Sequence, residues 1–208
     1  MAFKIPEFSL LEKYGIGLIP YATAKTEDGA AKAAKRLGYP VALKVVSPQI
    51  VHKTDFGAVK IDIKDERRLR HAYEDIMENV RRRKVKGVLV QKMARKGVEL
   101  IIGGKLDPQF GHMIVLGMGG VYVEVFRDVS ARLCPIEKED VHEMVMELRS
   151  HPLLTGVRGM KPISIAKLET LTAKVCRMMV KENLKELDLN PVVFDAKGYD
   201  IVDVRFSK

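Results

Sequence analysis

The sequence predicts an α+β protein with mixed or antiparallel sheets. Helical and strand-like segments alternate along its 208 residues, and several strand-like segments follow one another through short turns, as in hairpins. A doubly wound parallel sheet would instead need a helix between successive strands. The composition, 47% hydrophobic and 30% charged, is typical of a globular protein that can bury a core.

Five segments carry a helical pattern. Thr26 suits an N-cap and Gly38 a helix end, while Asp65 suits a second N-cap before apolar residues that recur at helical spacing as far as Val80. The predicted helices span residues 6–14, 26–37, 65–80, 138–150 and 163–183.

The strand-like segments are short apolar runs bounded by turn residues. One of them, residues 112–126, predicts a strand, a glycine turn and a second strand. The other predicted strands span residues 40–46, 58–63, 87–93, 97–106, 186–194 and 199–206.

The net charge of +9 is spread along the chain, with the densest cluster in "RRRKVK" at residues 81–86. This run follows a helical pattern, and a solvated helix end, where cations suit the dipole, explains it most simply. No aromatic residues interleave with the cations and no nucleic-acid motif is present, so we do not expect nucleic acid as a partner.

Two further features bear on the compartment. No stretch approaches 18 apolar residues and the first residues lack the apolar core of a signal peptide, so we expect a cytoplasmic protein without a membrane partner. Cys134 and Cys176 stand far apart in no paired motif, and we expect both to pack as small apolar groups.

Lys44 lies inside the apolar strand "VALKVV". Alternation places Val41, Leu43 and Val45 on one face and Lys44 between apolar neighbours on the other. Because an unpaired buried ammonium is costly, Lys44 must face either solvent or an anion. The pattern favours a cleft, and an exposed strand lysine remains the alternative.

The segment "SPQIVHKTDFG" carries a candidate phosphoryl acceptor, His52. A histidine ring nitrogen can take a phosphoryl group, Lys53 could screen its charge, and Gly57 would let the backbone approach a ligand. An ordinary loop histidine is the alternative.

Three glycines, Gly117, Gly119 and Gly120, interrupt the segment "LGMGGVYVEV". They fit no dinucleotide fingerprint, because no helix follows and the spacing is wrong. A tight hairpin turn and a backbone cradle for an anion both remain open.

Polar residues interrupt two strands near the end of the sequence. Asp188 and Asn190 share a strand face, and Asp203 on the next strand can lie opposite them. Magnesium prefers a few carboxylate or amide oxygens together with phosphate oxygens. These residues therefore indicate either a metal site or the polar face of an edge strand.

Taken in order, these motifs resemble one family. "GYPVALKVVSPQIVHKTDFGAVKIDI", "VELIIGGKLDPQFGHMIVLGMGG" and "LKELDLNPVVF" are similar to the ATP-grasp subunit of ADP-forming acetyl-CoA (acyl-CoA) synthetases, and the resemblance covers nearly the whole chain. The beta subunit of succinyl-CoA synthetase is a more distant relative.

The resemblance implies an ATP-grasp fold of two α+β lobes, here residues 1–90 and 91–208, that hold ATP or ADP with Mg²⁺. By this resemblance, His52 takes part in a phosphoryl relay. The nucleotide-binding residues would be Lys44 at the phosphates, Gln91 and Met93 near adenine, Glu99 near the ribose, and Gly57, Gly117, Gly119 and Gly120 along the phosphoryl path. The magnesium ligands would be Asn190 and Asp203, with Asp188 beside them.

The reaction implied by the resemblance converts acyl-CoA, ADP and phosphate to free acid, ATP and CoA. It requires a CoA-binding alpha subunit that carries the main phosphohistidine, so the chain would act in a hetero-oligomer. The alternatives are a non-catalytic nucleotide-binding regulatory module and a ligase subunit like that of succinyl-CoA synthetase.

Overall fold

The computed structural model describes residues 2–50, 54–120, 127–157, 159 and 161–208. The chain forms two compact units: unit 1 comprises Met1–Ile5 and Ile19–Met93, and unit 2 comprises Pro6–Leu18 and Ala94–Lys208. The lobes expected from the sequence assign residues 6–18 to the first lobe, whereas in the structure this segment packs with the second unit.

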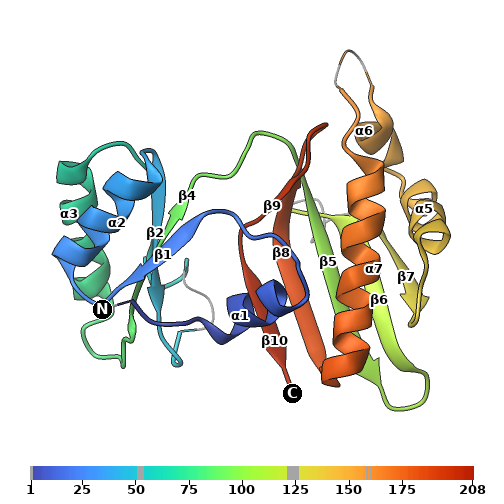
Figure 1. The fold of residues 1–208 in the computed structure, drawn as a ribbon, viewed down its shortest axis with the longest axis horizontal. Helices are drawn as coiled ribbons and strands as arrows, with labels where there is room; N and C mark the ends of the chain where they lie inside the picture. Colours follow the sequence, from blue (N-terminus) through green and yellow to red (C-terminus); the bar gives the residue numbers. More distant parts are fainter. Residues whose placement is uncertain (1, 51–53, 121–126, 158, 160) are drawn as a thin grey trace. The chain divides into compact units, whose positions relative to one another are not determined.

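Unit 1 is an antiparallel sheet with the strand order β1-β4-β2-β3. Helices α2 and α3 lie side by side against one face of this sheet (Figure 1). In chain order the elements are β1 (Tyr21–Ala24), α2 (Glu27–Leu37), β2 (Val41–Val46), β3 (Val59–Ile63), α3 (Glu66–Asn79) and β4 (Gly87–Lys92).

Both helices of unit 1 begin at the predicted N-caps. The Thr26 hydroxyl accepts a hydrogen bond from the Gly29 N–H at 3.2 Å, and the Asp65 carboxylate accepts one from the Arg68 N–H at 2.8 Å. Their apolar faces, including Leu69, close the core over the sheet. Capping and amphipathic spacing therefore determined these two helices locally.

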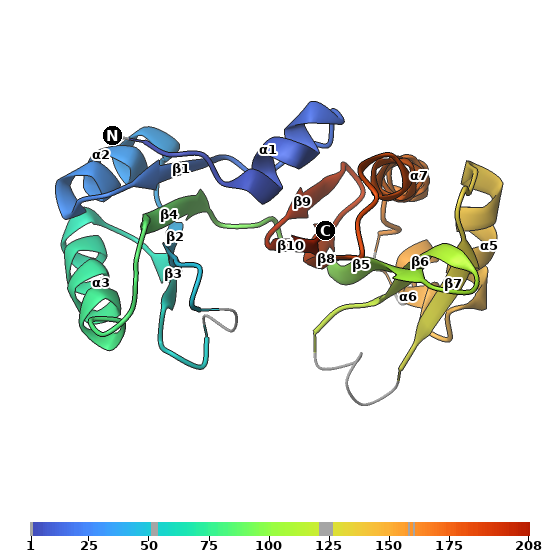
Figure 2. The same ribbon diagram turned by 90° about the horizontal axis from the view of Figure 1, so that it is seen from below.

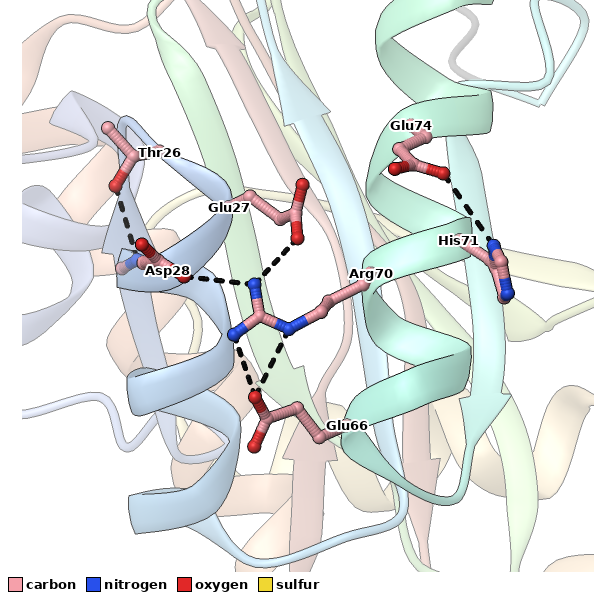
Figure 3. Close-up of polar contacts among 8 residues, drawn as sticks. Thr26, Glu27, Asp28, Glu66, Arg70, His71 and Glu74 are labelled. Carbon is pink, nitrogen blue, oxygen red and sulfur yellow. Dashed lines mark hydrogen bonds and ion pairs between the residues drawn. The ribbon is translucent and has the colours of Figure 1, made fainter.

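Arg70 joins the two helices of unit 1 (Figure 3). Its guanidinium donates to Glu27 at 2.7 Å and Asp28 at 2.9 Å, both at the start of α2, and to Glu66 of α3 at 2.7 Å. The hydrogen bond to Glu27 contributes most to raising the pKa of Arg70. The network fixes the start of α2 against α3.

Unit 2 is an antiparallel sheet with the order β10-β8-β5-β6-β7, and β9 also pairs with β8. Its strands are β5 (Val98–Asp107), β6 (Gly111–Met118), β7 (Val129–Leu133), β8 (Glu186–Phe194), β9 (Tyr199–Ile201) and β10 (Val204–Ser207). Its helices are α1 (Pro6–Lys13), α5 (Lys138–Glu147), α6 (His151–Thr155) and α7 (Ile165–Glu182). No helix in the described ranges is both long and apolar enough to cross a membrane.

Helix α7 packs on β5 and β6 and defines the buried face of this sheet (Figure 2). Gly104 of β5 faces α7, because a Cβ atom there would lie 2.3 Å from the Met179 sulfur. Leu187 of β8 pairs with Gly104 and is buried. Alternation therefore turns Asp188 and Asn190 to the face away from α7.

Several short elements of the structure were not predicted from the sequence. β1, α6 and β7 were not predicted, and the strand predicted at 199–206 is divided into β9 and β10. The second strand expected within 112–126 falls on residues 121–126, outside the described residues. Among the described strands, β6 pairs with β5 and β7. Elements of four or five residues show too little periodicity to be recognised alone.

The expectation for the cysteines was wrong. Cys134 and Cys176 form a disulfide with a Cα–Cα distance of 6.2 Å, which joins the segment after β7 to the middle of α7. Two cysteines separated by 42 residues carry no local signal of pairing, so only the tertiary structure could bring them together.

Candidate functional site

Lys44 lies on β2, on the face away from α2 and α3. Leu43 and Val45 belong to the core beneath those helices, as alternation predicted. Only 6% of Lys44 is exposed, and its neighbours across the strands are Leu89 and Val59. Because a buried ammonium needs compensating contacts, this position suits a side chain that acts on an anion.

Gln91 lies in the adjacent row of the same sheet, opposite Ala42. Its exposed fraction is 1%, and its side-chain amide nitrogen has no hydrogen-bond partner within the described part of the chain. A buried donor without a partner is costly, and a ligand acceptor would remove that cost.

Met93 follows β4 and is held by two contacts within unit 1. Its N–H donates to the Pro40 carbonyl at 3.4 Å, and its sulfur accepts from the Asp62 N–H at 3.4 Å. The Met93 backbone is therefore held against the segment before β2, and its side chain against β3.

His52 and Lys53 lie outside the described residues, but the turn that follows them is described. Gly57 has φ +59°, and a Cβ atom there would lie 2.7 Å from the Asn79 amide nitrogen. That amide donates to the Gly57 carbonyl at 3.2 Å. Gly57 is thus required by the turn and by its close contact with α3.

The polar residues of unit 2 meet on β8 and the chain beside it. The Asn190 N–H donates to the Asp203 carbonyl at 3.2 Å, so these two residues are cross-strand neighbours. Asp188 shares their face and lies opposite Arg205 of β10. The structure therefore brings together all three residues that the sequence suggested as metal ligands.

Arg205 adds a cation to this group. Its guanidinium lies 3.5 Å from the Asp203 carboxylate, and Asp203 is 21% exposed. Desolvation raises the pKa of Asp188, although its side chain keeps contact with solvent. The positive charge of Arg205 lowers this pKa, and the negative charge of Asp203 raises it further. The group is thus an acidic surface with one compensating arginine, which a metal ion would suit.

Arg205 is a site residue that was not predicted from the sequence. It stands two residues after Asp203, so the same alternation that grouped Asp188 with Asn190 also places Arg205 beside Asp203. Strand periodicity was the signal that could have identified it.

Glu99 and the glycines of "GMGG" lie beside one another in unit 2. The Gly119 N–H donates to the Glu99 carbonyl at 2.7 Å. A Cβ at Gly119 would lie 3.0 Å from the Glu99 backbone, and one at Gly117 would lie 2.6 Å from Val129. Gly120 has φ +69° and lies near the Glu99 carboxylate. Close strand packing and a positive φ thus account for these glycines.

The residues of unit 2 fit magnesium only as a partial ligand set. Among the residues that the structure describes, no three His, Cys, Asp or Glu side chains are grouped for a metal ion. Asp188, Asn190 and Asp203 supply two carboxylates and one amide. Magnesium usually takes one or two carboxylates together with phosphate oxygens and water, so this set suits a metal that arrives with a nucleotide.

Comparison with known proteins identifies the fold. Residues 5–207 match the family described as ATP-grasp domain. The Candidatus Korarchaeum cryptofilum acetyl-coenzyme A synthetase 1, solved with coenzyme A and Ca-AMPCP, has 43% identity and a TM-score of 0.93, covering 97% of this chain and 90% of that chain. Another structure of that synthetase contains Mg-AMPPCP and has a phosphohistidine segment pointing towards the nucleotide binding site.

Two curated relatives differ in length. Acetate–CoA ligase [ADP-forming] I of Archaeoglobus fulgidus is 47% identical over 94% of this chain, which spans only 29% of that protein. The beta subunit of acetate–CoA ligase [ADP-forming] I of Pyrococcus furiosus is 41% identical, and the match covers 94% of this chain and 87% of that subunit. The chain therefore belongs to the ATP-grasp family, in the group formed by the beta subunits, and the corresponding domains, of ADP-forming acetate–CoA ligases.

Proposed function

We propose that this chain is the nucleotide-binding subunit of an ADP-forming acyl-CoA synthetase. It would exchange a phosphoryl group between ADP or ATP and a histidine, coupled to the conversion of acyl-CoA and phosphate to acid and CoA. The observation that carries the proposal is the 41% identity to a beta subunit of which the chain covers 87%. We expect this function in the cytoplasm.

Lys44 and Gln91 would contribute to nucleotide binding from unit 1. The buried ammonium of Lys44 suits the phosphates. The amide nitrogen of Gln91, which has no partner among the described residues, suits an acceptor on the base. Met93, held by one backbone and one side-chain contact, would lie near adenine. Gly57 would hold the turn after His52.

Unit 2 would contribute the metal ligands. Asp203 and Asn190 would bind Mg²⁺ directly, with Asp188 beside them. A Mg²⁺ ion held there would supply positive charge that stabilises the charge developing during phosphoryl transfer. Arg205 would balance part of the negative charge of Asp203 and Asp188 beside that site.

The ribose and the phosphoryl path would lie near the glycine segment. Glu99 suits the ribose hydroxyl groups as an acceptor, and Gly117, Gly119 and Gly120 keep the backbone free of side chains beside it. These assignments rest on the family resemblance together with the contacts of Glu99.

His52 would relay the phosphoryl group to a partner. Its ring nitrogen would accept the group from ATP, and a CoA-binding alpha subunit with its own phosphohistidine would receive it. The phosphohistidine segment of the Korarchaeum synthetase supports such a transfer. The partner would hold the acyl pocket, so the acyl substrate is not assigned.

Co-purification from the source cell, followed by an assay of acyl-CoA-dependent ATP synthesis, tests the function. We expect the isolated chain to bind ADP in the presence of Mg²⁺, and to make ATP from acyl-CoA, ADP and phosphate only with its partner. Nucleotide binding without any such synthesis in the purified complex would instead support the regulatory module. Normal phosphoryl transfer in a His52→Ala complex would exclude the relay.

A further inference from the structure

The formal charge of the chain is concentrated in unit 1. Unit 1 contains 18 Lys and Arg residues against nine Asp and Glu residues, whereas unit 2 contains 18 of each. The whole excess of +9 therefore belongs to the smaller unit. Such an excess raises the local concentration of anions around this unit.

Part of this charge surrounds a hollow of about 410 Å³ in unit 1. We name it the arginine hollow; it is lined by Phe56, Glu78, Asn79, Arg81, Arg82 and Arg83. Glu78 is the one acidic residue among the described residues that line it, and it pairs with Arg81. Within the described ranges, neither Arg82 nor Arg83 has a carboxylate partner.

The guanidinium of Arg83 is held in one orientation. Its carbon lies 4.1 Å from the centre of the Phe56 ring. Stacking on an aromatic face restrains the guanidinium plane and leaves its N–H groups free to donate at the edge. This arrangement suits the oxygens of a phosphate group.

The backbone that presents these arginines is also fixed. Two hydrogen bonds at Lys84 anchor residues 80–86. The Lys84 N–H donates to the Gln49 side chain at 2.7 Å, and the Lys84 carbonyl accepts from the Ser47 hydroxyl at 2.6 Å. On the other wall, the Asn79 amide donates to Gly57 at 3.2 Å and holds the turn that carries Phe56. The hollow is thus preorganised on both walls.

From these contacts we infer that the arginine hollow is a second anion site, which takes a phosphate-rich small molecule. Guanidinium groups bind phosphate oxygens through paired, charge-assisted hydrogen bonds, and three of them exceed what one carboxylate can neutralise. The ligand is an inorganic polyphosphate or an organic phosphate ester. This inference does not depend on the proposed nucleotide function.

A titration of the ¹⁵N-labelled full chain with inorganic tripolyphosphate, followed by NMR at physiological salt, tests the site. We expect saturable shifts of the amides of Arg81, Arg82 and Arg83. We expect an Arg82→Gln/Arg83→Gln variant to bind at least tenfold more weakly. The matched control, Lys32→Gln/Arg67→Gln, removes two exposed charges from the same unit and should change affinity less than threefold.

Two results would overturn the inference. One is that the amide shifts of the wild type are absent or do not saturate. The other is that both double variants lose the same affinity for tripolyphosphate, which would show that binding depends on the net charge of the unit and not on these arginines. Arg83→Lys keeps the charge but loses the planar fork, and we expect this single variant to bind tripolyphosphate more weakly than the wild type. A parallel titration with coenzyme A distinguishes an organic phosphate ester from an inorganic polyphosphate as the ligand. Shifts of the same three arginine amides with coenzyme A would indicate a phosphate ester. Shifts at Lys44 would report separately on the nucleotide site.

Discussion

The main-chain N–H of Asn190 donates to the carbonyl of Asp203 over 3.2 Å, and this bond brings two oxygen-bearing side chains onto one face of β8 and its neighbour. Twelve residues, including the whole of β9, separate them along the chain. The antiparallel return of the chain thus assembles the candidate metal ligands.

Replacing Asp203 by Asn should weaken the binding of Mg-ADP by about tenfold or more, because a charged oxygen ligand is lost. Calorimetric titration of ADP with and without Mg²⁺ measures this. Glu186→Gln removes an exposed carboxylate from β8, the strand of Asn190, and as the matched control it should bind normally. An Asp203→Asn variant with unchanged Mg²⁺ dependence would contradict the assignment.

Replacing Lys44 by Met should lower nucleotide affinity roughly 10- to 150-fold. This range corresponds to the loss of one charge-assisted hydrogen bond, which contributes about 1.5–3 kcal/mol. Methionine keeps the length and apolar stem of the side chain, so the variant should remain folded. Equilibrium binding of ADP, with circular dichroism as the folding control, measures both. Unchanged affinity in the folded variant would exclude Lys44 from the site.

The stability of unit 2 should fall in acid through Glu182. Lys13 foremost, with Lys208 and Tyr14, lowers the pKa of Glu182 from 4.5 to about 2. The depressed pKa means that this stabilisation is complete above about pH 4.5 and is lost as the pH falls towards 2. The difference in melting temperature between wild type and Glu182→Gln should therefore be constant above pH 5 and shrink below it.

The Glu186→Gln variant is the matched control, because Glu186 is exposed and makes no ion pair in the described part of the chain. A Glu182→Gln difference that stays constant down to pH 2.5 would show that its contacts are not electrostatic.

Reduction of the Cys134–Cys176 disulfide should destabilise the chain by about 4 kcal/mol, because the bond closes a loop of 42 residues. Thermal unfolding with and without reductant measures this. The Cys134→Ala/Cys176→Ala variant should melt near the reduced wild type and should not respond to reductant. Identical melting of oxidised and reduced wild type would contradict a stabilising bond.

Local signals in the sequence predicted much of unit 1. The caps at Thr26 and Asp65 and the alternation around Lys44 depend on neighbours within a few residues, and the structure agrees with them. The family resemblance extended this to the ATP-grasp fold, which the comparisons confirm. The roles of the individual site residues stay predictions, and His52 lies outside the described residues.

Local patterns in the sequence were enough to predict the helices with strong caps, the strand face that carries Lys44, and the residue types from which a magnesium site could be built. The bond between Cys134 and Cys176, the pairing of Arg205 with Asp203, and the stacking of Arg83 on Phe56 became visible in the folded chain alone. Caps and periodicity act over one or two turns of chain, whereas these contacts depend on strand register and on the packing of segments distant in sequence.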